Sequence, residues 1–76
     1  MDLNNKKNME TNYIIILDFS VGEIIRIKLD KNQKEESEKY VDFEEYLETL
    51  EEKYDFNLKD CLWMVTENYS ERSFGF

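Results

Sequence analysis

The apolar residues in the first part of the chain follow two strand patterns. Residues 13–17 form a short, uninterrupted and largely β-branched run, which is typical of a strand covered on both faces. Residues 24–29 alternate instead, with aliphatic side chains on one face and the basic side chains Arg26 and Lys28 on the other. The segment 20–23 between them contains a glycine, which suits a tight turn. The two runs therefore predict an antiparallel β-hairpin.

The strongest helical signal lies in the middle of the chain. Asp42 and Glu45 have the spacing of a capping box, and Val41 with Tyr46 occupies the positions of a hydrophobic staple. Apolar residues then recur at the three- and four-residue spacing of one helix face. This pattern predicts a helix over residues 43–54. Its expected core-facing side chains are Phe43, Tyr46, Leu47, Leu50 and Tyr54.

The segments on either side of this helix differ in apolar content. Residues 30–40 are highly charged and have no apolar face, so we expect a loop or a short solvated helix there. Residues 61–66 form a second short apolar run and predict a strand. In residues 72–76, Phe74 and Phe76 alternate around a glycine, which favours a further short edge strand.

These elements together predict one small α+β domain. A β-hairpin followed by an amphipathic helix and one or two further strands gives the order ββαβ or ββαββ, with the helix packed on one face of an antiparallel or mixed sheet. A crossover of the usual handedness lets the third strand lie beside the first. We place this domain at residues 12–76. Residues 1–11 are polar and predict a disordered N-terminal tail.

A sheet of this size leaves one face without a helix. Ile14 or Ile15, Ile24 and part of residues 62–65 would then expose more apolar surface than a monomer usually tolerates. Trp63 belongs either to the core or to such an interface, where tryptophan is enriched. The expected function is therefore a small acidic protein-interaction module, with a homodimer as the simplest assembly.

Charge narrows the choice of partners. The net charge of -8 disfavours direct binding to nucleic acid or to an anionic membrane surface. The hydrophobic content of 41% nevertheless indicates a folded chain rather than a disordered acidic one. No apolar run approaches the length of a membrane span, and a single cysteine fits a reducing compartment, so the expected location is cytoplasmic.

The acidic face of the predicted helix is a candidate interaction site. Glu44, Glu45, Glu48, Glu51 and Glu52 lie opposite the apolar stripe, and we expect Glu44, Glu48, Glu51 and Glu52 to be exposed. One interpretation is a solvated helix face. The alternative is a charge ladder that imitates nucleic-acid phosphates and inhibits a nucleic-acid-binding protein. In size and acidity, though in no motif, the chain is similar to short proteins of phages and mobile elements, some of which inhibit host nucleic-acid enzymes.

The sequence contains no pattern that indicates catalysis. It has no histidine, which is the commonest general base and metal ligand. Cys61 stands in an apolar run and is interpreted as a small buried side chain. Gly22 and Gly75 form no phosphate-binding loop, and the calcium-loop pattern that opens at Asp30 places Lys34 where a ligand is needed. We therefore expect no enzymatic activity, no cofactor and no metal site.

Overall fold

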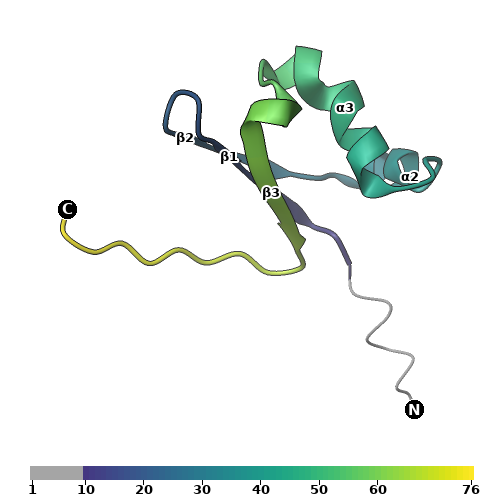
Figure 1. Cartoon of the computed structure of the whole chain (residues 1–76). Coiled ribbons are helices and arrows are strands. Elements are labelled where there is room, and N and C mark those ends of the chain that lie inside the picture. The colour runs from purple at the N-terminus through teal and green to yellow at the C-terminus, as the bar shows by residue number, and fades with distance from the viewer. Residues whose placement is uncertain (1–9) are drawn as a thin grey trace.

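The computed structural model describes residues 10–76. They form a small α+β domain with a three-stranded antiparallel sheet and two α-helices, which confirms the predicted fold class. The order along the chain (Figure 1) is β1 (Tyr13–Asp18), β2 (Glu23–Lys28), α2 (Lys31–Ser37), α3 (Phe43–Tyr54), the 3-10 turn η1 (Leu58–Asp60) and β3 (Cys61–Thr66).

The first strand lies at the centre of the sheet. The strand order is β2-β1-β3, so the third strand pairs with the first, as expected. Ile14 of β1 lies opposite Ile27 of β2 and Val65 of β3. Because side chains alternate along a strand, this row marks one face and the neighbouring row, which contains Ile15, marks the other.

One hydrophobic core joins the sheet, α3 and the segment between α3 and β3. Its buried members are Ile14, Ile16, Ile27, Leu29, Tyr46, Leu47, Leu50, Phe56, Leu58 and Cys61. The aromatic rings of Phe43 and Trp63 extend this core, with centroids 5.9 Å apart. Figure 1 shows α3 lying on one side of the sheet. Of the predicted apolar stripe, Phe43 and Tyr54 are only partly buried.

The charged segment after β2 forms the short solvated helix α2. Its N-terminus is fixed by a reciprocal pair of hydrogen bonds: the Asp30 carboxylate accepts from the Gln33 N–H at 2.8 Å, and the Gln33 side chain accepts from the Asp30 N–H at 3.0 Å. No residue of α2 is buried. Capping, rather than an apolar face, therefore explains why this segment begins a helix.

At the N-terminus of α3, one of the two hydrogen bonds of the predicted capping box is present. The Asp42 carboxylate accepts from the Glu45 N–H at 2.9 Å. The Glu45 carboxylate, however, accepts from Val41 N–H at 3.3 Å, one residue earlier than in a capping box. The predicted hydrophobic staple is wrong, because Val41 is 91% exposed while Tyr46 is buried. The hydrogen bond to Glu45 holds the backbone before the helix and leaves the Val41 side chain in solvent.

The segment that follows β3 is extended but is not a strand. Residues 67–76 pair with no neighbouring strand, so the alternative of a fourth strand at 72–76 is wrong. The predicted disordered tail, residues 1–11, lies outside the described residues except for Glu10 and Thr11. Within residues 10–76, no helix has both the length and the apolar character needed to cross a membrane.

Candidate interaction surface

The face of the sheet that turns away from the core is the candidate interaction surface, and we call it the open face. Its strand residues follow from the pairing register: Tyr13, Ile15, Leu17, Ile24, Arg26, Lys28, Leu62, Met64 and Thr66. The sequence predicted that such a face would exist but left open whether Ile14 or Ile15 belongs to it. The register assigns Ile15 to the open face and Ile14 to the core.

Large apolar side chains are concentrated at one end of the open face. Leu17 lies between Ile24 of β2 and Leu62 of β3, so the three form one row across the sheet. Together with Met64 they are between 44% and 64% exposed. Ile15, at the centre of the face, is only 7% exposed. The result is a continuous apolar patch that the protein's own helices do not cover.

A shallow apolar groove of ≈ 200 Å³ lies in this patch, between β1 and β3. Its lining residues are Ile15, Leu17, Leu62, Trp63 and Met64. Trp63, the aromatic candidate from the sequence, therefore borders this groove. The register, however, places the Trp63 side chain in the core-facing row beside Ile16, where its ring lies 5.9 Å from that of Phe43 and packs against the core. The groove has about the volume of one large apolar side chain.

The charged strand residues of the open face, Arg26 and Lys28, are basic, and none of its strand residues is acidic. Arg26 Nη1 lies 3.4 Å from the Tyr69 hydroxyl and 3.6 Å from a carboxylate oxygen of Glu71. The hydrogen bond with Tyr69, assisted by the charge of Glu71, raises the pKa of Arg26. Lys28 Nζ lies 5.9 Å from the ring centroid of Tyr13. In a chain with 18 acidic residues, the strand residues of this face thus include no acid, and Glu71, which comes from the segment after β3, is paired there with Arg26.

The acidic face of α3 is a separate surface. Glu44, Glu48 and Glu52 are exposed, as predicted. Glu51 is only partly exposed, because its carboxylate accepts a 2.6 Å hydrogen bond from the Leu58 N–H. Of the five glutamates in the predicted ladder, four are therefore exposed, Glu45 included, and the role of the ladder in interaction stays a prediction.

The one cysteine has the environment of a core residue. The Cys61 thiol donates to the Asn57 carbonyl at 3.2 Å. Burial raises the pKa of Cys61, which keeps the thiol protonated and weakly nucleophilic. Nearby, Oδ1 of the buried Asp18 accepts from both the N–H and the hydroxyl of Ser20, at 3.0 and 2.6 Å. Among residues 10–76, no three His, Cys, Asp or Glu side chains are grouped to hold a metal ion.

Comparison with known protein families, with curated proteins and with solved structures finds no match for this chain. Function is therefore inferred from the surfaces of the molecule itself.

Proposed function

We propose that this protein is a small, non-catalytic protein-interaction module that associates with a second copy of itself through the open face. One observation carries the proposal: Leu17, Ile24 and Leu62 form an exposed apolar row across the sheet, on a face whose strand residues include no acid. Contiguous exposed apolar patches mark binding surfaces, and the centres of interfaces are depleted of charged residues.

The balance of forces favours this face over the others. Burying one large aliphatic side chain contributes about 1.5–3 kcal/mol, so the row offers a substantial driving force even after the entropy lost on association. Repulsion between two copies, each with a net charge of -8, opposes it. Because Glu44, Glu48 and Glu52 lie on α3, contact through the open face keeps these acids of the two copies apart.

Two substitutions on the open face test the proposal. Ile24→Thr with Leu62→Thr removes apolar surface from the two edge strands and leaves at both positions a β-branched residue that suits a strand. We expect sedimentation velocity to show a dimer for the unchanged chain and a monomer for the double variant, with circular dichroism unchanged. Val41→Thr, which removes an exposed aliphatic residue beside α3, should leave the dimer intact. A double variant that still associates like the unchanged chain would exclude the open face as the interface.

Substitutions on the acidic face of α3 provide a second control. They also distinguish open-face self-association from the alternative function, inhibition of a nucleic-acid-binding protein. Glu44→Gln, Glu48→Gln and Glu52→Gln together should leave open-face association intact or strengthen it, because they reduce repulsion. An inhibitor that imitates nucleic acid would instead lose its basic partner on the same substitutions, and its binding would weaken with salt.

A further inference from the structure

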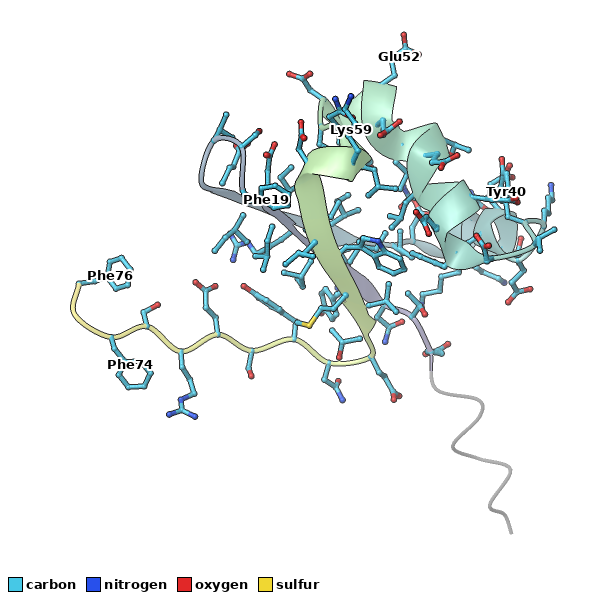
Figure 2. The ribbon with its side chains drawn as sticks, in the orientation of Figure 1. Phe19, Tyr40, Glu52, Lys59, Phe74 and Phe76 are labelled. Carbon is cyan, nitrogen blue, oxygen red and sulfur yellow. The ribbon has the colours of Figure 1, made fainter. Side chains whose placement is uncertain are left out.

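The segment after β3 carries large apolar side chains that do not pack against the rest of the domain. We call residues 69–76 the C-terminal arm. The arm begins on the open face, where the rings of Tyr69 and Tyr13 lie with centroids 5.9 Å apart and Glu71 pairs with Arg26. Beyond this point Phe74 and Phe76 are 73% and 108% exposed. Figure 2 shows both rings standing clear of the rest of the molecule.

The path of the arm leads away from its own groove. The chain leaves the end of β3, passes β1 at Tyr13 and reaches the edge strand β2 at Arg26. The groove lies behind it, between β1 and β3. Phe74 follows Glu71 by three residues, a reach of about 10 Å in an extended chain. Figure 1 accordingly shows the last residues running away from the body of the molecule.

Folding back would require a reversal between Glu71 and Phe74. The structure has no turn or bend at residues 69–76, and the rings of Phe74 and Phe76 are both exposed. The one glycine of the arm, Gly75, has φ 81° but follows Phe74. The rings are therefore placed to meet a second molecule at the β2 edge rather than their own sheet.

The arm and the groove match in chemistry. Tyr69, Phe74 and Phe76 make the arm aromatic, and its two charged side chains, Glu71 and Arg72, cancel. The arm can therefore approach a copy of this acidic chain without net side-chain charge. The groove is lined by aliphatic and thioether side chains and has room for one ring.

We propose that the C-terminal arm of one copy packs on the open face of the other, with Phe74 or Phe76 in the groove between β1 and β3. This inference rests on the proposed self-association and identifies which part of the second copy covers the groove. A two-fold axis makes the exchange reciprocal, so that both grooves are filled.

Removal of the two rings tests the exchange in the full chain. Phe74→Ser with Phe76→Ser should raise the dimer dissociation constant about tenfold or more, as expected for aromatic anchors in an interface. Val41→Ser is the matched control and should leave the dissociation constant unchanged. If the double variant dimerises as tightly as the unchanged chain, the arm inference is overturned and open-face association stands. If the unchanged chain itself does not associate, both fail together.

A second measurement locates the rings. A dimer is prepared from one isotopically labelled and one unlabelled copy, and isotope-filtered nuclear Overhauser spectra select contacts between the copies. We expect contacts from the rings of Phe74 and Phe76 to methyl groups of Leu17, Leu62 or Met64 across the dimer. Contacts found only within one copy, or only to α2 and α3, would overturn the exchange.

Discussion

Leu47 is fully buried in the core between α3 and the sheet, whereas its neighbour Glu48 is exposed on the same helix. Leu47→Ala should lower the free energy of unfolding by about 2–4 kcal/mol, because it removes apolar contacts and leaves a cavity. Glu48→Ala should change it by less than about 0.5 kcal/mol. Urea unfolding at one fixed protein concentration measures both, since self-association would add to apparent stability. A loss for Glu48→Ala as large as that for Leu47→Ala would contradict this assignment of the two helix faces.

At the scale of single residues, helical spacing predicts most of the burial on α3. It places Tyr46, Leu47 and Leu50 correctly in the core. It fails for Glu51, because the hydrogen bond from Leu58 is made by a residue beyond the helix that no local pattern includes. It also fails for Val41, whose backbone N–H is held by Glu45.

At the scale of elements, α3 depends on its N-terminal cap. Asp42→Ala removes the carboxylate that accepts from the Glu45 N–H and should lower the free energy of unfolding by about 1 kcal/mol. Asp42→Asn keeps an acceptor at this position and should retain most of the stability. Thermal unfolding followed by circular dichroism compares the variants. Equal stability of the alanine and asparagine variants would mean that the cap contributes nothing.

The elements themselves are predicted best where pattern and local capping agree. The hairpin, α3 and β3 follow from periodicity and length. The α2 segment has no periodicity, and the Asp30–Gln33 capping pair is the signal that would have chosen helix over loop. The alternation of Phe74 and Phe76 suggested a strand, but alternation specifies a face and not a neighbouring strand with which to pair.

At the scale of the whole molecule, the sequence predicts that one face of the sheet is apolar and uncovered. It does not predict which residues form that face. Both residue sets of 13–17 are apolar, so periodicity cannot say which set faces α3, and only the register separates Ile14 from Ile15. The role that we propose for the arm, as a partner for this face in a second copy, was not predicted from the sequence. Its signal was present in Phe74 and Phe76, but its meaning depends on the anchor at Arg26, which only the tertiary structure shows.

Measuring self-association of the unchanged chain is the most direct test of the proposed open-face dimer. The salt dependence of the dissociation constant shows whether the interface is built from apolar contacts. Each copy carries a net charge of -8, so added salt should screen the repulsion between copies and strengthen an interface built from apolar contacts. Sedimentation equilibrium at micromolar concentration, from about 0.05 to 0.5 M salt, measures the dimer dissociation constant as the Debye length shortens. We expect a dimer whose dissociation constant falls as salt rises. A chain that stays monomeric across this whole range would contradict open-face self-association.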